Sequence, residues 1–173
     1  DPTFSWALPA GITGVSMVAD HNSATDPGTR SDGLVSSYTY PNVEDGSWYF
    51  HIRLKNANGW GPITHYKFQI DTKKPEFFNL SLVEPVTALD PRAHLLLQAR
   101  DASSGIASYE IAIDNNETQT WVDDGSHKMR TSALSSGTHT VVVKAKDKAG
   151  NYLTSSIDVM VEQMVAPVIT KYT

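Results

Sequence analysis

Apolar and polar side chains alternate over short stretches of this chain, the pattern of β-strands with one buried face. Between residues 48 and 55, one set of alternate positions holds Trp, Phe, Ile and Leu, and the other set holds Tyr, His, Arg and Lys. Residues 63–70 repeat the alternation, and Asn58-Gly59, which tolerates positive φ, lies between the two stretches. The pattern predicts an antiparallel hairpin.

The same pattern returns later in the chain. Residues 46–59 align without a gap on residues 137–150, and two further strands, 138–146 and 152–161, flank the second turn. No stretch carries a 3.6-residue apolar stripe bounded by helix caps. A repeat of this length is a whole small domain, so the sequence predicts an all-β chain of two tandem β-sandwich modules.

Prolines and charged residues mark the module boundaries. The run Asp71-Thr72-Lys73-Lys74-Pro75 cannot continue a central strand, so we expect the first module at 1–72 and the second at 73–165. We expect residues 166–173 to be a linker or the start of a further repeat. The first module lacks the strand that residues 77–83 supply in the second, which would leave it an exposed sheet edge.

Composition excludes several classes of partner. The formal net charge is −5 and no run of Lys or Arg occurs, which argues against binding to nucleic acid or to an anionic membrane. No apolar stretch approaches the roughly 20 residues that span a bilayer, so we expect no membrane insertion. The chain has no Cys, which excludes disulfides and thiol chemistry. Because it opens at Asp1 without Met, we expect a fragment of a longer protein.

Several segments resemble known families. Residues 4–9, 46–53 and 58–62 resemble fibronectin type III-like modules of bacterial surface proteins, and the Gly-x-Trp-Tyr-Phe segment at 46–50 is also similar to the Tyr-rich β-sandwich of bacterial sensor ectodomains. In the second copy, Asp101-Ala102-Ser103-Ser104-Gly105-Ile106 and Asp147-Lys148-Ala149-Gly150-Asn151 look like signatures of bacterial Ig-like repeats. The resemblance implies two tandem Ig-like/fibronectin type III-like β-sandwich modules.

The resemblance also implies an exported, non-catalytic protein at a bacterial cell surface. The first expectation is a structural or spacer repeat, with or without an adhesive role, whose partners are neighbouring modules of the same chain. An alternative is a module that binds surface polysaccharide or protein through loop aromatics, and a further alternative is a sensor ectodomain. Such folds carry many functions, so the fold alone does not choose among them.

No catalytic motif is recognisable. The six His are scattered without metalloprotease spacing, and neither a Gly-x-Ser-x-Gly elbow nor a Gly-rich phosphate loop is present. His51, His65 and His139 lie on predicted strands, mostly in the polar phase of the alternation, so we expect solvated side chains. The sequence therefore predicts that this chain is not an enzyme.

The aromatic residues suggest both a core and a binding surface. Trp6 and Trp48 are in phase with buried strand positions, so we expect them in the core. Trp60 follows the hairpin tip between two glycines, where it could pack on its own module, dock on a neighbouring module or anchor a ligand. Tyr49 is out of phase with the core and is the next candidate for ligand contact.

Acidic turns suggest a Ca²⁺ site. A fibronectin-like topology would bring Asp101, Asp147 and Asn151 of the second module near Asp71, Glu44 and Asp45 of the first, and such oxygen ligands suit Ca²⁺. The alternative is that these Asp and Asn side chains only bond to backbone amides in their own turns. The first module has Asn56 where the second has Asp147, so the acidic turn is not shared by both copies.

Overall fold

A computed structural model of the chain describes residues 1–163, 168 and 170. The chain divides into two compact units, Asp1–Thr72 (unit 1) and Lys73–Thr173 (unit 2). Apart from Val168 and Thr170, the expected further repeat at 166–173 lies outside the described residues.

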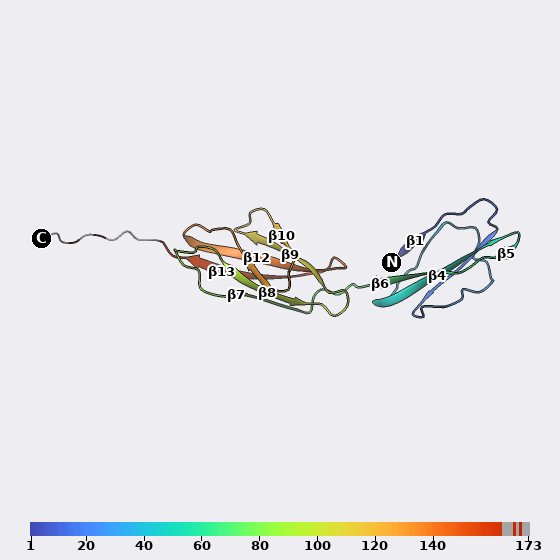
Figure 1. Cartoon of the computed structure of the whole chain (residues 1–173), viewed down its shortest axis with the longest axis horizontal. Coiled ribbons are helices and arrows are strands. Elements are labelled where there is room, and N and C mark those ends of the chain that lie inside the picture. The colour runs from blue at the N-terminus through green and yellow to red at the C-terminus, as the bar shows by residue number, and fades with distance from the viewer. Residues whose placement is uncertain (164–167, 169, 171–173) are drawn as a thin grey trace. The chain divides into compact units, whose positions relative to one another are not determined.

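Unit 1 is built from six strands in two sheets (Figure 1). They are β1 (Thr3–Ser5), β2 (Gly14–Asp20), β3 (Ser37–Thr39), β4 (Gly46–Asn56), β5 (Gly59–Trp60) and β6 (Thr64–Ile70). β1 pairs with β3 in one sheet, while β4 lies at the centre of the other between β2 and the β5 and β6 strands. All of these pairs are antiparallel.

The predicted first hairpin is confirmed. β4 pairs with β6 from Gly46 opposite Ile70 to Ile52 opposite Thr64. The turn at its tip is tight because Gly59 adopts a φ of 114°, a conformation that favours glycine.

A one-residue shift interrupts this hairpin after its tip. β5 places Trp60 opposite Lys55, and a regular continuation would place Thr64 opposite His51. In the structure His65 lies opposite His51 instead. A shift of one residue changes which face each side chain occupies. The irregularity at residues 61–63 therefore keeps the apolar positions of β4 and β6 on one face and brings the two histidines together on the other.

Aromatic rings fill the space between the two sheets of unit 1. Phe50 of β4 is 5% exposed and stacks on Phe4 of β1 with ring centroids 4.4 Å apart, while Phe68 of β6 lies edge-on to Phe4 at 4.9 Å. Trp6 and Trp48 are only half-buried. The expectation that they lie on the apolar face is correct, but the expectation that they are buried core residues is wrong. Trp48 instead contacts the imidazole of His21, with ring centroids 3.9 Å apart.

The other face of β4 is also covered. The side chain of Ser16 donates to the carbonyl of Pro27 at 2.9 Å, and Arg53 forms an ion pair with Asp26 at 3.2 Å. These contacts hold residues of the β2–β3 connection against the polar face of the sheet, and His51 on that face has no exposed surface. The expectation of a solvated His51 is therefore wrong.

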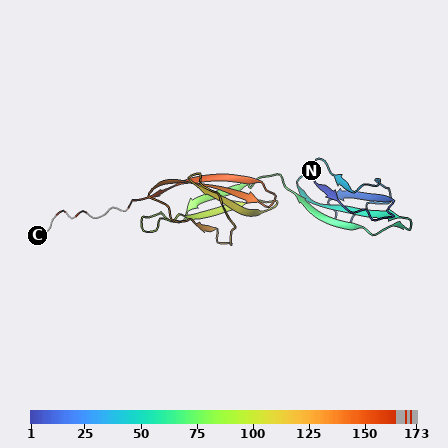
Figure 2. The ribbon, with the colours of Figure 1, turned by 90° about the horizontal axis from the view of Figure 1, so that it is seen from above.

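Unit 2 contains seven strands in two sheets, seen from a second direction in Figure 2. They are β7 (Phe77–Leu82), β8 (His94–Arg100), β9 (Ile106–Ile113), β10 (Gln119–Trp121), β11 (Lys128–Arg130), β12 (Gly137–Asp147) and β13 (Tyr152–Val161). One sheet has the order β11-β8-β7 and the other has the order β10-β9-β12-β13. The predicted second hairpin is confirmed, because β12 pairs antiparallel with β13 from Gly137–Val161 to Lys146–Tyr152.

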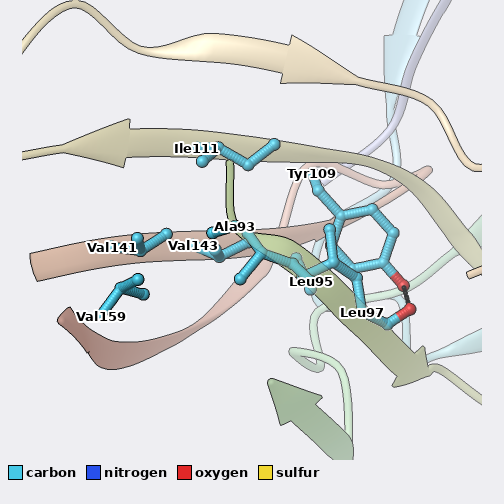
Figure 3. Packing of buried hydrophobic residues seen from close by; sticks show 9 residues of the cluster. Ala93, Leu95, Leu97, Tyr109, Ile111, Val141, Val143 and Val159 are labelled. Atoms are coloured by element: carbon cyan, nitrogen blue, oxygen red, sulfur yellow. Dashed lines mark hydrogen bonds between the residues drawn. The ribbon is translucent and has the colours of Figure 1, made fainter. Parts of the chain in front are cut away.

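The core of unit 2 is mainly aliphatic (Figure 3). Alternate residues of β8, β9, β12 and β13 point into the space between the sheets, as the period of two requires. The buried cluster consists of Ala93, Leu95, Leu97, Tyr109, Ile111, Val141, Val143, Ala145 and Val159. Tyr109 is its one aromatic member, and its hydroxyl donates to the carbonyl of Leu97.

The architecture confirms the expected fold class, an all-β chain of two β-sandwich modules. Among the residues that the structure describes, there is no helix long and apolar enough to cross a bilayer.

Candidate functional site

Trp60 packs on its own module. Its indole lies beside two cations of the neighbouring strand, with the guanidinium of Arg53 5.6 Å and the ammonium of Lys55 5.8 Å from the ring centroid. Both contacts are within the range of cation–π attraction. Trp60 is half-buried, so part of the ring remains accessible between the two basic side chains.

Tyr49 and Trp60 lie well apart along the hairpin formed by β4 and β5. Trp60 lies opposite Lys55, and Tyr49 is six residues before Lys55 on the same strand. At about 3.3 Å per residue, this separation is roughly 20 Å. Tyr49 is half-buried and stacks at 6.3 Å on the ring of His51.

A groove in unit 1 combines aromatic and charged side chains. Its volume is about 570 Å³, and its lining includes Met17, Arg30, Asp32, Tyr38 and Tyr40. Burial is the main cause that raises the pKa of Tyr40 to about 12, and the nearby Asp32 carboxylate acts in the same direction. The Tyr40 hydroxyl therefore keeps its proton at neutral pH and can donate a hydrogen bond. A groove with these side chains can accommodate a polar ligand that has an apolar face.

The acidic residues of unit 2 are brought together by its loops. A carboxylate oxygen of Asp101 and one of Asp147 lie within 4.8 Å of each other. Asp101 Oδ1 accepts hydrogen bonds from the backbone amides of Ser103, Ser104 and Gly105 at 3.1, 2.8 and 2.9 Å. Burial acts to raise the pKa of Asp101, but these hydrogen bonds outweigh it and hold the pKa below its usual value.

Asp147 and Asn151 form a turn of their own. Asp147 is 2% exposed and accepts from both the backbone and the side-chain amide of Asn151, at 2.8 and 2.9 Å. Both acidic loops of unit 2 thus make the local backbone contacts that the turn-capping alternative requires.

The candidate Ca²⁺ ligands of unit 1 lie near the ends of β4 and β6. Asp45 Oδ1 accepts from the backbone amide and the hydroxyl of Thr72, both at 2.9 Å. Glu44 has an exposed side chain, and its carbonyl accepts from the indole of Trp48 at 3.0 Å. Asp71 is half-buried. The Ca²⁺ prediction stays a prediction.

Ser135, His139 and Asp114 resemble a nucleophilic triad in unit 2. His139 Nδ1 lies 2.5 Å from Asp114 Oδ2, and its Nε2 lies 3.4 Å from the Ser135 hydroxyl. The same Nε2 is 2.8 Å from the Ser135 carbonyl, a better acceptor position for its proton. In the doubly protonated form that two such acceptors favour, the imidazole has no lone pair with which to deprotonate Ser135, and that form does not fit base catalysis.

The same two acceptors favour the charged imidazole. The hydrogen bond with Asp114, supported by the Ser135 carbonyl, raises the pKa of His139. His139 is 8% exposed, so the expectation of a solvated side chain is wrong here as well. Its alternation phase is that of Val141 and Val143, which pointed to the buried face and could have revealed it.

A second histidine site, in unit 1, was not anticipated. His51 Nδ1 lies 2.6 Å from His65 Nδ1, and His51 Nε2 lies 3.4 Å from Asp20 Oδ1. The alternation along β4 and β6 placed both histidines on one face, but only the register shows that they are directly opposed.

Comparisons with known proteins agree with this fold. The model of the bacterial Ig-like domain family matches residues 94–163, from β8 to just beyond β13. The FN1–FN3 domains of chicken CNTN1 are similar with a TM-score of 0.54 and 13% identity over 93% of this chain, which spans 61% of that structure. The fibronectin(III)-like modules of Clostridium thermocellum CbhA are similar with a TM-score of 0.51 and 14% identity, covering 99% of this chain and 90% of that one. No curated protein sequence matches the chain.

Similarity at such low identity shows the fold and leaves the activity open. Modules of these two kinds are typically non-catalytic repeats of extracellular or surface proteins. The chain therefore consists of two successive β-sandwich modules of the Ig-like and fibronectin type III-like kind, and the second contains the match to the bacterial Ig-like domain family.

Proposed function

We propose that this chain is a non-catalytic structural repeat of an exported bacterial protein, in which the two modules act as a spacer at or outside the cell surface. The observation that carries this proposal is the succession of two compact β-sandwich units along the chain, one with a bacterial Ig-like match. The partners of such a repeat are the neighbouring modules of its own chain. In unit 2 the imidazole of the Ser135, His139 and Asp114 arrangement contacts two acceptors, which also supports a non-catalytic role.

A ligand screen tests the spacer proposal. The chain is applied to arrays of neutral and acidic bacterial polysaccharides and analysed by affinity electrophoresis in gels that contain each polysaccharide. A spacer shows no saturable retardation and no turnover of the sugars. Saturable binding to one class of polysaccharide contradicts a purely structural role. Labelling of intact cells with an antibody against this chain tests the surface location separately.

A second function, carbohydrate binding, is supported by the groove that Tyr38 and Tyr40 line. Its volume of about 570 Å³ lies in the range of small-ligand sites. Tyr38 is 42% exposed and offers a ring face for stacking on the C–H surface of a sugar, while Arg30 and Asp32 can hydrogen-bond its hydroxyls. The exposed part of Trp60, flanked by Arg53 and Lys55, is the alternative surface and suits an acidic polysaccharide.

Two variants distinguish these surfaces if the screen detects a ligand. Tyr38→Ala abolishes retardation if the groove binds the sugar, and Trp60→Ala leaves it unchanged. The opposite result assigns binding to the surface formed by Trp60, Arg53 and Lys55. Tyr152→Ala, which removes an exposed tyrosine of unit 2, is the matched control and leaves binding intact in both cases.

A further inference from the structure

His51 and His65, on two neighbouring strands of unit 1, form a pair of imidazoles in which one ring is buried and the other is exposed. They are direct cross-strand partners, and their rings lie edge to face with centroids 4.8 Å apart. His51 is fully buried, whereas His65 on the edge strand β6 is exposed. The two Nδ1 atoms are 2.6 Å apart, so one of them donates a proton and the other accepts it.

Asp20 sets the tautomer of His51. Its Oδ1 is 3.4 Å from His51 Nε2, on the side of the ring opposite His65. The hydroxyl of Thr25 donates to the other carboxylate oxygen at 2.6 Å and holds the carboxylate in place. An ionised Asp20 favours a proton on Nε2 of His51, which leaves the Nδ1 lone pair directed at His65.

We propose that His51 Nδ1 and His65 Nδ1 bind one divalent late transition-metal ion, Zn²⁺ or Cu²⁺, in place of the proton that the two rings share. Neutral imidazole nitrogens are preferred ligands of these ions. Asp20 is then the outer partner of the ligating His51, the carboxylate–histidine–metal arrangement that fixes ring orientation and increases ligand basicity.

The pair can open to the required width. Metal–nitrogen bonds of 2.0–2.1 Å with a tetrahedral angle separate two nitrogens by about 3.3 Å, which is wider than the present contact. His51 is held by its burial and by the stacked ring of Tyr49, so His65 makes the adjustment. Its exposed side chain has the freedom to do so, and solvent at the edge strand completes the coordination.

Zinc titration of the whole chain, followed by NMR, tests the proposal. The His51 and His65 imidazole signals are expected to shift together and to saturate at one ion per chain. His65→Gln removes an exposed ligand without disturbing the buried ring, and we expect it to weaken Zn²⁺ binding at this site by at least about 10-fold. Asp20→Asn keeps an oxygen acceptor but removes the charge, and we expect a loss of about 10–100-fold.

His127→Gln, which changes an exposed histidine of unit 2, is the matched control and leaves the His51 response unchanged. Cu²⁺ is expected to bind more tightly than Zn²⁺ at the same site, as the order of stabilities for divalent metals requires. The proposal is overturned if the His51 and His65 signals do not respond to Zn²⁺ at millimolar concentration. It is equally overturned if folded His65→Gln shows the same His51 response as the wild type.

Discussion

Tyr109 links the two sheets of unit 2 through a single hydroxyl. It is 2% exposed, donates to the carbonyl of Leu97 at 3.3 Å and accepts from the amide of Ala99 at 3.1 Å. The ring packs between Phe78 and Trp121. A buried hydroxyl with both roles satisfied contributes to stability, and its loss leaves the partly buried amide of Ala99 without this partner.

We therefore expect Tyr109→Phe to lower the free energy of unfolding of unit 2 by about 1–2 kcal/mol. Chemical denaturation of the whole chain, with circular dichroism as the probe, measures this change. Tyr152→Phe removes an exposed hydroxyl of the same unit and serves as the control, with no change expected. Equal stability of Tyr109→Phe and the wild type would mean that water replaces the tyrosine hydroxyl.

The ion pair between His139 and Asp114 makes the stability of unit 2 depend on pH. The Asp114 hydrogen bond raises the pKa of His139, so this histidine stabilises the fold fully below its usual pKa of 6.5, and the contribution is lost as pH rises through the raised value. The pKa of Asp114 is lowered, first by the hydrogen bond from His139, so its contribution is lost as pH falls through that lowered value. The pair stabilises most between these two limits.

We expect the melting temperature of unit 2 to fall between pH 6 and pH 8 by more in the wild type than in His139→Gln. Calorimetry of both proteins across this range gives the difference, which isolates the contribution of the pair from other titrating groups. Parallel pH profiles of the two proteins would contradict this role. His21→Gln in unit 1 is the control and should retain the wild-type dependence.

At the residue scale, the sequence predicted the faces of side chains better than their burial. Alternation placed Phe50 on the apolar face and His51 on the polar face of β4, and both assignments are correct. Burial of His51 depends on the β2–β3 connection, which lies over the polar face. This connection has no periodic pattern of apolar residues from which its course could be predicted. The alternation of side chains describes only strands, so it does not predict the contacts of an irregular segment.

At the scale of elements, the hairpin of unit 1 depends on one glycine. Gly59 has a φ of 114°, and apart from its two chain neighbours no residue has an atom within 4 Å of the position where a Cβ would stand. The cost of a side chain there is therefore backbone strain alone, about 1–3 kcal/mol. We expect Gly59→Ala to lower the stability of unit 1 by this amount, measured by thermal denaturation. Asn58→Ala in the same turn is the control, and an equal effect of both variants would contradict the assignment of the strain to φ.

The register of the hairpin, unlike its strands and turn, could not be predicted from the sequence. Both strands of the hairpin and the turn between them followed from alternation and Asn58-Gly59. The register irregularity at residues 61–63 did not follow from the sequence. It nevertheless decides that His65, and not Thr64, lies opposite His51. A bulge of one residue changes little in the composition of a loop, so only the pairing itself reveals it.

The acidic loops of unit 2 offer a test of the Ca²⁺ prediction. Asp101 Oδ1 accepts three backbone amides, a role that a neutral amide oxygen can also fill. If Asp101 only caps its loop, Asp101→Asn has nearly the wild-type melting temperature and Asp101→Ala loses about 0.5–2 kcal/mol. If Ca²⁺ binds, the wild type is stabilised by millimolar Ca²⁺ and destabilised by chelator, and Asp101→Asn loses this response.

We expect Ca²⁺ to raise the melting temperature of the wild type if Asp101, Asp147 and Asn151 act as ligands, because an ion bound only by the folded state shifts the equilibrium. Mg²⁺ at the same concentration is the control for ionic strength. A melting temperature indifferent to Ca²⁺ and to chelator would leave the turn-capping role alone for these residues.

At the scale of the whole molecule, two units of one fold use different interiors. Unit 1, every residue of which is described, buries two hydrophobic side chains below a tenth of their surface, Val15 and Phe50. Unit 2 buries ten such side chains within its described part. Internal repetition predicted the shared architecture, but it did not predict this inequality, because the two copies share strand periodicity and differ in the residues that fill it.

Unit 1 is therefore expected to unfold before unit 2 on heating. Burial of apolar surface is the main favourable term in folding, and unit 1 has fewer fully buried apolar side chains per residue. Trp6, Trp48 and Trp60 lie in unit 1 and Trp121 lies in unit 2, so Trp121→Phe makes tryptophan fluorescence report unit 1 alone. We expect the fluorescence midpoint of Trp121→Phe to lie below the main transition seen by circular dichroism.

Two core variants test this order of unfolding. Phe50→Leu should lower only the fluorescence midpoint. Leu97→Ala should lower only the later transition, with a loss of about 2–5 kcal/mol in the free energy of unfolding of unit 2. Coincident midpoints that shift together in both variants would show that the two units unfold as one cooperative body.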